Sequence, residues 1–453
     1  MEKIRTDIVT TAQVENRLYI LDNNPHQLII DEGIDVIFVP QDYINEYKEL
    51  NPTLSEIIQP YNYGTIQKTK PEFYKKVAVI MTNESNPAAM AFCYANGFAS
   101  NENYMTMEEA EAVTGEDLGE KCKDNLDLTH FEEFQYFTGV EKLYKYAFWG
   151  CDNLEIIACP LSLKELDAQI WGIGATQWNQ GHRSKLKHIS GLKNVEVVGS
   201  NCLQHLTELL TCDFSDKLRE NKGNFFIHCP KLEDCGDLSG IRTTTNAILA
   251  GTNVSSVYLN VAGKLPSNQN LKTVHIPWEE TTQLPFTFLG SDGSTGTIGA
   301  AVEEIPNMPN LLSFGVGSKG QSITFQNCFY LRYVGAMPKV EVIPQATFLG
   351  CCRLEYLKDL SSVTTLGVQA FDMCFALQEI NLPECTTVGN QAFRINTSMT
   401  EGDLIVNFGN AYSKMTIASN AFSGRHRNHI KIYCEGVELT NEQYTAVGVT
   451  TIS

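Results

Sequence analysis

The stretch VTTLGVQAFDMCFALQEINLP, residues 363–383, contains one turn of an internal repeat and decides the fold. Its central motif, Phe-x-x-Cys-x-x-Leu, occurs five times in the chain, and the last three copies follow one another at intervals of 23 residues. The copies are Phe148/Cys151/Leu154, Phe226/Cys229/Leu232, Phe325/Cys328/Leu331, Phe348/Cys351/Leu354 and Phe371/Cys374/Leu377. Three motifs in one strict register indicate a repeat array rather than a set of unrelated domains.

The residues around the motif keep the same phase. An apolar residue follows the motif Leu after three positions in four copies, and Ala392-Phe393 and Ala421-Phe422 resemble two further, decayed turns. The Leu-x-x-Ile-x-Leu part predicts a short strand whose alternate residues point inward. The Ala-Phe-x-x-Cys part suits the opposite side of the turn. Since each coil buries its apolar side only against the next coil, we expect all the motif residues to form core ladders spaced by about 4.8 Å.

The cysteines of the motif follow from the same ladder. We expect Cys151, Cys229, Cys328, Cys351 and Cys374 to be buried, reduced thiols that act as small apolar fillers. A metal or disulfide role is the alternative, although neighbours in a ladder are spaced by the repeat and not by ligand geometry. Cys351 and Cys352 are adjacent, so at most one of them points inward. No C-x-x-C pair is found among the 14 cysteines, which argues against zinc-ribbon and redox motifs.

Composition narrows the classes of function. The 453 residues suit two or three domains or one long repeat array. The formal net charge of -19 argues against nucleic acid as a partner, because phosphate binding requires clustered Lys and Arg. No apolar run of about 18 residues occurs, so we expect no membrane insertion. Residues 1–10 lack the apolar core of a secretory leader. We therefore expect a cytoplasmic chain, one released by lysis, or one whose leader has been removed.

The repeat resembles the BspA-like leucine-rich repeat family, which is found in gut Bacteroidetes, their phages and some parasites. The phase of residues 363–383 carries this resemblance, which covers roughly residues 130–433. Between about 160 and 320 the match is poor, since motif copies there lie 78 and 99 residues apart, so we expect insertions and eroded turns. The resemblance implies an α/β repeat, a leucine-rich repeat solenoid, with a small N-terminal α+β module and a helical lead-in.

Four segments are expected along the chain. Residues 1–85 form an N-terminal α+β module, residues 86–126 a helical lead-in or cap, residues 127–433 the solenoid and residues 434–453 a C-terminal cap. In the first segment we expect strands near 17–21, 27–30 and 35–39 and a helix at 41–48. In the second, Asn86 opens one helix and Thr106 caps another. The Gly/Ser/Thr-rich stretch 290–300 predicts a loop.

Three further segments resemble parts of the same family. Residues 36–58 resemble its strand-Pro-helix module, and residues 430–444 resemble a shortened form that caps the open end of the solenoid. Residues 93–137 resemble the dockerin- or calcium-loop-like lead-in that precedes such repeats. Asn96, Asn101, Glu102 and Asn103 do not have the ligand spacing of a calcium loop. A structural helical cap is therefore the expectation, bound calcium is the alternative, and no other cofactor is expected.

No motif in the sequence indicates a catalytic site. No His-Glu-x-x-His, Gly-x-Ser-x-Gly, P-loop or dinucleotide fingerprint is present, and neighbouring carboxylates alone do not make an acid/base pair. Exposed aromatics are better candidates for binding, because Trp buries much area at low entropic cost. The candidates, each weighed against a role in packing, are Trp149, Trp171, Trp178 and Trp278. The dense basic cluster Arg425, His426, Arg427 and His429 is either a solvated turn or an anion or sugar contact.

The sequence therefore predicts a non-catalytic binding or adhesion protein that presents the repeat surface to a host-cell protein or glycan. Without a leader, it predicts a phage virion protein, a fibre or capsid accessory, that contacts other virion proteins. The alternatives are a bacterial cell-surface adhesin whose leader is absent and an enzyme on a solenoid scaffold. An oligomer is compatible with each, although no heptad stretch predicts one.

Overall fold

The computed structural model describes most of the chain. The residues outside the description are 1–10, 15–16, 21–27, 29–34, 62–78, 173–182, 245–247, 250, 261–267, 269, 287, 291–298, 396–401 and 451–453. The described chain divides into two compact units, residues 1–171 with 184–192 and residues 172–183 with 193–453. The segment limits expected at residues 85, 126 and 433 stay predictions.

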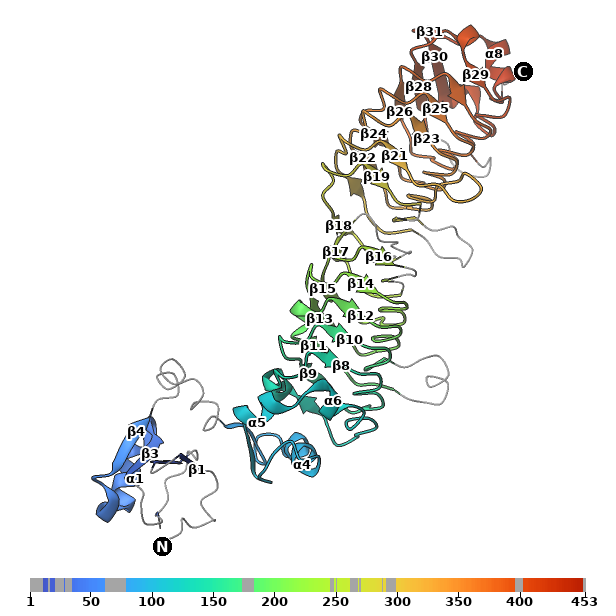
Figure 1. Ribbon diagram of the computed structural model, residues 1–453. Coiled ribbons are helices and arrows are strands. Elements are labelled where there is room, and N and C mark those ends of the chain that lie inside the picture. Colours follow the sequence, from blue (N-terminus) through green and yellow to red (C-terminus); the bar gives the residue numbers. More distant parts are fainter. Residues whose placement is uncertain are drawn as a thin grey trace. The chain divides into compact units, whose positions relative to one another are not determined.

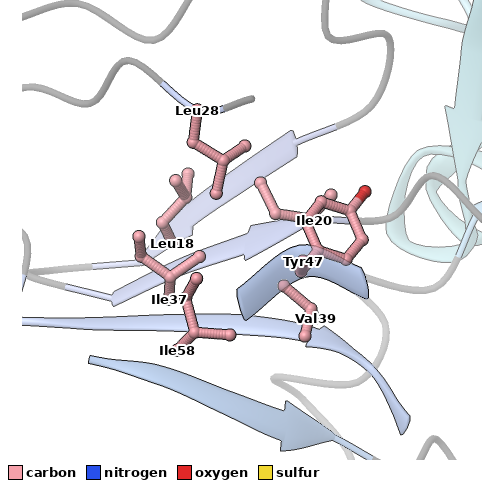
Figure 2. Close-up of a cluster of buried hydrophobic side chains, with 7 residues drawn as sticks. All are labelled: Leu18, Ile20, Leu28, Ile37, Val39, Tyr47 and Ile58. Carbon is pink, nitrogen blue, oxygen red and sulfur yellow. The ribbon is translucent and has the colours of Figure 1, made fainter. Parts of the chain in front are cut away.

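A small sheet with one helix opens the first unit. The strands are β1 (Thr11–Val14), β2 (Arg17–Ile20), β3 (Val36–Pro40) and β4 (Ile58–Tyr61), in that order. β1 runs antiparallel to β2, whereas β2, β3 and β4 are parallel. Helix α1 (Ile44–Leu50) places Tyr47 on the apolar side of this sheet, as Figure 2 shows. Alternate strand residues supply the rest of the core, namely Leu18, Ile20, Ile37, Val39 and Ile58, together with Leu28.

Two of the strands expected in this module are confirmed, since β2 and β3 fall at 17–20 and 36–40. The helix expected at 41–48 is also confirmed, as a 3-10 turn at Gln41–Tyr43 followed by α1. The strand expected at 27–30 lies outside the described residues except for Leu28, which has no regular secondary structure. β4 and the 3-10 turn Pro52–Leu54 were not predicted.

A pair of short antiparallel strands and three capped helices follow. Strands β5 (Val79–Thr82) and β6 (Tyr104–Thr106) pair antiparallel, and the helices are α4 (Pro87–Ala95), α5 (Met107–Ala112) and α6 (Gly115–Leu118). Asn86 accepts a hydrogen bond from Ala89 N, and Thr106 forms a capping box with Glu109. Both helix starts expected from the sequence are confirmed.

Repeat coils complete the first unit. One parallel set contains β7 (His130–Phe131), β9 (Ile156–Ala158) and β11 (His188–Ser190), and a second contains β8 (Lys142–Leu143) and β10 (Glu165–Leu166). A 3-10 helix at Glu132–Tyr136 lies between β7 and β8. Each coil thus contributes one strand to each of two parallel sheets, as the solenoid prediction requires.

The second unit repeats this arrangement through many more coils (Figure 1). Its first coils hold the parallel sets β13 (Thr211–Phe214), β15 (Asp234–Leu238), β17 (Ser256–Leu259), β18 (Thr273–His275) and β12 (Val197–Val198), β14 (Glu220–Asn221), β16 (Thr243–Thr244). A 3-10 turn, Leu192–Asn194, precedes β12. The repeat therefore persists through much of the section in which eroded turns were expected.

The later coils build two longer sheets. The larger one contains β20 (Glu304–Ile305), β22 (Tyr333–Val334), β24 (Tyr356–Leu357), β26 (Glu379–Leu382), β28 (Leu404–Phe408), β30 (Ile430–Cys434) and β31 (Val437–Glu438). The smaller one contains β23 (Val342–Ile343), β25 (Thr365–Leu366), β27 (Thr387–Val388) and β29 (Thr416–Ile417). β19 (Gln283–Leu284) pairs separately with β21 (Ser313–Phe314). Two 3-10 turns, Tyr412–Lys414 and Arg427–His429, lie beside the last strands.

Stacked aromatic rings form the core of the later coils. The rings of Phe325, Phe348, Phe371, Phe393 and Phe422 lie one above another, with successive centroids 5.3, 5.2, 5.5 and 4.9 Å apart and interplanar angles of at most 13°. All 15 motif residues expected in the core are at most 3% exposed, which confirms the prediction. The decayed turns at 392–393 and 421–422 therefore keep the phase of the intact ones.

The motif leucines are core residues, but their expected place in the strand needs correction. All five are buried, namely Leu154, Leu232, Leu331, Leu354 and Leu377. Each lies two residues before its strand begins, whereas the sequence pattern placed it inside the strand. In the first four of them the leucine N–H donates to the carbonyl of the motif cysteine at 3.0 or 3.1 Å. This bond closes a turn, so the leucine N–H is already used and the ladder starts only after the leucine.

The motif cysteines are free, buried thiols, as expected. Cys351 Sγ donates to Phe325 O (3.1 Å) and Cys374 Sγ donates to Phe348 O (3.2 Å), so each thiol bonds to the carbonyl of the ring residue one coil earlier. Cys351 points inward while Cys352 is half-buried.

In several coils the second residue after the ring has a positive φ, as seen at His228, Asn327, Gly350, Met373 and Gly424. In two of these coils the residue is glycine, which adopts a positive φ without the steric cost that a side chain brings.

The C-terminal end is covered by a short hairpin and a helix. β31 pairs antiparallel with β30 and ends the parallel ladder, and α8 (Asn441–Ala446) begins with a capping box at Thr440. Tyr444 is buried, and its Oη accepts a hydrogen bond from Ile432 N at 2.8 Å. The segment 430–444 therefore closes the last strand. The loop expected at 290–300 lies outside the described residues except for Gly290, Gly299 and Ala300, which have no regular secondary structure.

Candidate binding surface

The outward side chains of the larger sheet form a continuous row. Strand register places Tyr333 beside Tyr356, Tyr356 beside Glu379, and Glu379 beside Ile405. The residues that follow each of them, such as Val334 and Leu357, are buried. Because side chains alternate along a strand, the row faces solvent while its neighbours face the core. Tyr356 is 42% exposed, so its ring is available to a ligand.

Charged groups hold the first tyrosine in place. Tyr333 Oη donates to Glu355 Oε2 at 3.0 Å, and Arg332 Nε donates to Glu355 Oε1 at 2.8 Å. The Arg332 guanidinium also lies 5.1 Å from the centre of the Tyr333 ring. Hydrogen bonds from Arg332 and Tyr333 hold the pKa of Glu355 below its ordinary value, so this carboxylate stays ionised. The cluster is fixed before any ligand arrives, which reduces the entropic cost of binding.

Amide groups continue the row on the next strands. Asn407 Nδ2 donates to Asn381 Oδ1 at 2.7 Å and to Glu379 Oε1 at 3.2 Å, and Asn381 Nδ2 donates to Glu379 Oε1 at 3.1 Å. Each amide retains further donor and acceptor capacity. We call the group formed by Arg332, Tyr333, Glu355, Tyr356, Glu379, Asn381 and Asn407 the tyrosine face. It combines flat rings with fixed hydrogen-bonding groups, the composition that binding surfaces favour.

The tryptophans expected to contact a ligand do not gather in one place. Trp171 is 3% exposed and stacks on Phe148 with centroids 6.0 Å apart, so it is a core residue and was wrongly taken as a binding candidate. Trp149 is half-buried beside Tyr146 and Lys123. Trp278 is half-buried and lines a groove of about 550 Å³. Trp178 lies outside the described residues. Only Trp149 and Trp278 remain candidates on the described surface.

The basic cluster is not a single anion site. Arg425 is fully buried, and its Nε donates to Phe393 O at 2.9 Å while Nη2 donates to Cys374 O at 3.3 Å. It occupies the cysteine position of its coil, three residues after Phe422, and makes the same bond to a ring residue's carbonyl. Both expectations for Arg425, a solvated turn and a ligand contact, are therefore wrong.

The other members of the basic cluster point to separate partners. Arg427 Nη2 donates to Glu438 Oε1 at 2.6 Å, and its guanidinium lies 3.9 Å from the Tyr444 ring centre, so it fastens the C-terminal helix. His429 Nδ1 lies 2.9 Å from Asp403 Oδ1, and His426 is exposed. Of the four residues, the two histidines are the ones that face solvent.

Two further kinds of feature concern the described residues, namely metal-binding groups and membrane-spanning helices. No group of three or more His, Cys, Asp or Glu side chains among them could hold a metal ion, and no described helix is long and apolar enough to cross a membrane. In the calcium-loop-like segment, Asn101 Oδ1 accepts from Asn103 N and Asn96 Nδ2 donates to Phe92 O. Each of these two amides bonds to backbone within its own turn.

The tyrosine face was missed in the sequence analysis, although a signal for it exists. Tyr333 and Tyr356 each stand two residues after a motif Leu, and Glu379 stands at the same place in the next coil. An apolar residue of the repeat follows each of them directly. Strand alternation sends the tyrosine position outward once that apolar residue is known to point inward. The exposed row of the tyrosine face could therefore have been predicted from the positions of the repeat motif.

Comparison with known proteins supports the repeat assignment. The family described as "BspA type Leucine rich repeat region" matches the chain in six copies over residues 119–172, 181–269 and 320–445, more than half of the sequence. Among curated proteins no match is found. The resemblance and the fold class expected from the sequence are both confirmed by the family match. Residues 270–319 lie outside the matched ranges, in the section for which insertions were expected.

Several solved structures are similar to the chain. A leucine-rich repeat protein from Bacteroides ovatus has 21% identity and a TM-score of 0.44, with 70% of this chain and 82% of that chain covered. A leucine rich cell surface protein from Faecalibacterium prausnitzii has 15% identity and a TM-score of 0.28, covering 64% and 86%. The pneumococcal vaccine antigen PcpA has 15% identity and a TM-score of 0.33, covering 66% and 78%.

Proposed function

Because this chain belongs to the BspA-type leucine-rich repeat family, we propose that it is a non-catalytic binding protein whose tyrosine face binds a cell-surface glycan. The observation that carries the proposal is the in-register pair Tyr333 and Tyr356, flanked by fixed carboxylate and amide groups. A repeat array supplies a rigid extended surface, which is what such a contact requires.

The chemistry of the tyrosine face suits a sugar better than an apolar ligand. The C–H face of a sugar ring packs on an aromatic ring, and adjacent hydroxyls pair with carboxylates and amides, which accept and donate in fixed directions. Glu379 and Asn407 lie within hydrogen-bonding distance of one another and form such a set. A host-cell protein is the alternative occupant, since Tyr and Arg are also common in protein interfaces.

The test of the proposal is a glycan array probed with the full chain, followed by calorimetry on the best sugar. We expect Tyr356→Ala and Tyr333→Ala to weaken binding by about tenfold or more, the loss typical of a residue central to an interface. Tyr94→Ala is the matched control, because Tyr94 is 48% exposed and lies on α4, outside the tyrosine face. Equal affinity of all three variants for the sugar would overturn the proposal. It would also be overturned if the chain bound no glycan on the array.

Enzymatic activity is tested with the same sugar. A binding protein returns the bound glycan unchanged, whereas release of shortened products after incubation would show the chain to be an enzyme on a repeat scaffold. Loss of products in Glu379→Gln but not in Glu341→Gln would then locate the reaction on the tyrosine face. We expect no products.

The place of action is a virion or a bacterial surface. We propose to search purified phage particles and cell envelopes of a Bacteroides-type host for peptides of this chain by mass spectrometry. Peptides in the particle would support the virion assignment and its contacts with other virion proteins. Peptides found only in uninfected envelopes would exclude it in favour of a bacterial adhesin.

A further inference from the structure

A groove of about 550 Å³ lies between β18 and β20 in the second unit. Its sides are β18, β20 and the residues that flank these strands. Its lining includes Lys272, His275, Trp278, Val302, Glu303 and Glu304. No backbone hydrogen bond joins β18 to β20, both of which the structure describes in full. The next coils on this sheet are joined, as Gly335 N to Ile305 O (2.8 Å) and Lys358 N to Val334 O (3.0 Å) show.

Proline removes one of the two backbone donors that would join β20 to β18, the other being the N–H of Glu304. Register aligns Glu304 with Tyr333, so Pro306 stands where Gly335 and Lys358 stand in the following coils. Those two residues donate the ladder bond, and proline has no N–H to donate. On the other sheet the same two coils remain joined, because Gly315 N donates to Leu284 O at 2.7 Å. The coils therefore separate on one side only.

The strand edges beside the groove present unused backbone groups. Thr273 N donates at 3.0 Å to the O of Ser255, the residue just before β17, so the alternation of a parallel strand turns the N–H and C=O of Val274 towards the groove. Glu303 O accepts a bond from Tyr333 N on β22 and Ile305 O accepts one from Gly335 N just after β22, so the backbone groups of Glu304 face the groove from the other side. The opening thus has hydrogen-bonding edges on both sides, in the direction of the strands.

We propose that this groove binds an extended peptide of a partner protein, which inserts as an additional strand between β18 and β20. Addition of a strand to a free sheet edge is an established mode of peptide recognition in proteins. The peptide backbone would pair with Val274 on one side and Glu304 on the other, and its alternate side chains would point into and out of the groove.

The lining specifies the side chains of the peptide. The ring of Trp278 is half-buried and packs edge-on against Phe288 with centroids 6.0 Å apart, so it forms a fixed apolar wall. Glu303 and Glu304 are adjacent and exposed on one rim, which favours a basic side chain. We therefore expect a peptide in which an apolar residue is flanked by Lys or Arg.

The groove is separate from the tyrosine face in its lining, since neither Tyr333 nor Tyr356 contributes to it. The peptide proposal therefore does not depend on glycan binding. A Tyr356→Ala variant should retain peptide binding, and a Trp278→Ala variant should retain glycan binding, so failure of one proposal is distinguishable from failure of the other.

The test begins with a display library of random octapeptides selected on the immobilised full-length chain. Enriched peptides are synthesised and their affinities measured by fluorescence anisotropy against variants of the chain. We expect Trp278→Ala and the double variant Glu303→Gln/Glu304→Gln each to weaken binding by about tenfold. Pro306→Ala supplies an N–H that can close the ladder onto β18, and it should also weaken binding. Pro344→Ala is its matched control, because Pro344 lies on the other sheet and outside this groove.

Backbone pairing is tested with two N-methylated forms of the best peptide, each carrying methyl groups on alternate residues. A strand inserted in the groove should lose about tenfold or more in affinity in at least one form, because methylation removes the donors of one edge. Binding of both methylated forms as tight as that of the unmethylated peptide would overturn the proposal, as would equal binding by the groove variants and the control. So would a selection without any groove-dependent peptide. Self-association abolished by Glu303→Gln/Glu304→Gln would instead identify a second copy of the chain as the occupant.

Discussion

The coils at residues 325–422 and those at residues 271–316 belong to one solenoid but differ in how their rings pack and in how their strands pair. In the first group, five rings stack face to face and each sheet pairs from coil to coil. In the second, Phe288 meets its neighbour Phe325 edge-on at 6.5 Å, and the pairing stops at β18 on one sheet and at β21 on the other. We call the two groups the regular array and the interrupted coils.

The two interruptions are alike in two respects: a proline stands at each of them, and the opposite sheet stays paired. Pro344 aligns with Gly367, whose N–H donates to Ile343 O at 2.8 Å, so here, as at Pro306, a proline stands where a ladder donor is expected. At each junction, however, the opposite sheet remains paired, through β19 with β21 in one case and β20 with β22 in the other. A solenoid can therefore open a groove on one face without losing the stack, which the other face maintains.

The largest expected difference between the two groups lies in the rings. Phe371→Ala removes two face-to-face contacts at 5.2 and 5.5 Å from a fully buried site, and we expect it to reduce the free energy of unfolding by about 3–5 kcal/mol. Phe288→Ala removes only edge contacts, where the coils already separate, and should cost less. Chemical denaturation of both variants measures this. An equal or larger loss in Phe288→Ala would show that the interrupted coils are packed as firmly as the regular array.

A smaller loss is expected at the end of the regular array. Arg425→Ala leaves the buried carbonyls of Phe393 and Cys374 without the donors that now bond them, which should cost about 2–3 kcal/mol. Arg425→Cys restores the motif thiol and should recover part of this loss, since thiols at this position donate to the same carbonyl in earlier coils. The control is Arg353→Ala, an exposed site expected to change stability little. If Arg425→Cys is no more stable than Arg425→Ala, the substitution interpretation is wrong.

The contrast between the two groups also explains what could be predicted from sequence. Packing fixes the spacing of core residues, so the register of Phe348, Cys351 and Leu354 was sufficient to predict the fold and the buried positions of the motif. Arg425 escaped prediction because its side chain replaces a thiol that it does not resemble. The groove escaped because the effect of Pro306 depends on strand register, which the repeat pattern does not supply in the interrupted coils. Prediction of the tyrosine face required one further step. Because side chains alternate along a strand, the residue before each buried strand residue points to solvent.

The proline explanation predicts that an interruption can be transferred. Lys358→Pro removes the donor to Val334 O within the regular array and should cost about 1–3 kcal/mol, the combined effect of a lost ladder bond and a constrained backbone. Pro306→Lys makes the reverse change and should alter stability by less than about 1 kcal/mol, because the new bond is offset by the looser unfolded chain. Thermal and chemical unfolding provide the measurement, with Lys358→Ala as the control. A Lys358→Pro protein as stable as its Ala control would remove proline as the cause of the gaps.

The smallest effect concerns pH. Burial raises the pKa of Cys229 and Cys328 to about 12, from the 9.0 of an exposed thiol, so both stay protonated in the folded chain. Unfolding exposes thiols that ionise above pH 9, hence the stability they contribute is complete below pH 9 and is lost as pH rises towards 12. No cysteine occurs between Cys235 and Cys328, so the interrupted coils lack this sensitivity to pH.

Site-resolved alkylation with iodoacetamide at pH 8 and pH 10 measures the effect. It should label half-buried Cys352 first and the thiols of the regular array only at the higher pH. Rapid labelling of Cys351 or Cys374 at pH 8 would mean that the regular array opens more readily than its stacked rings imply.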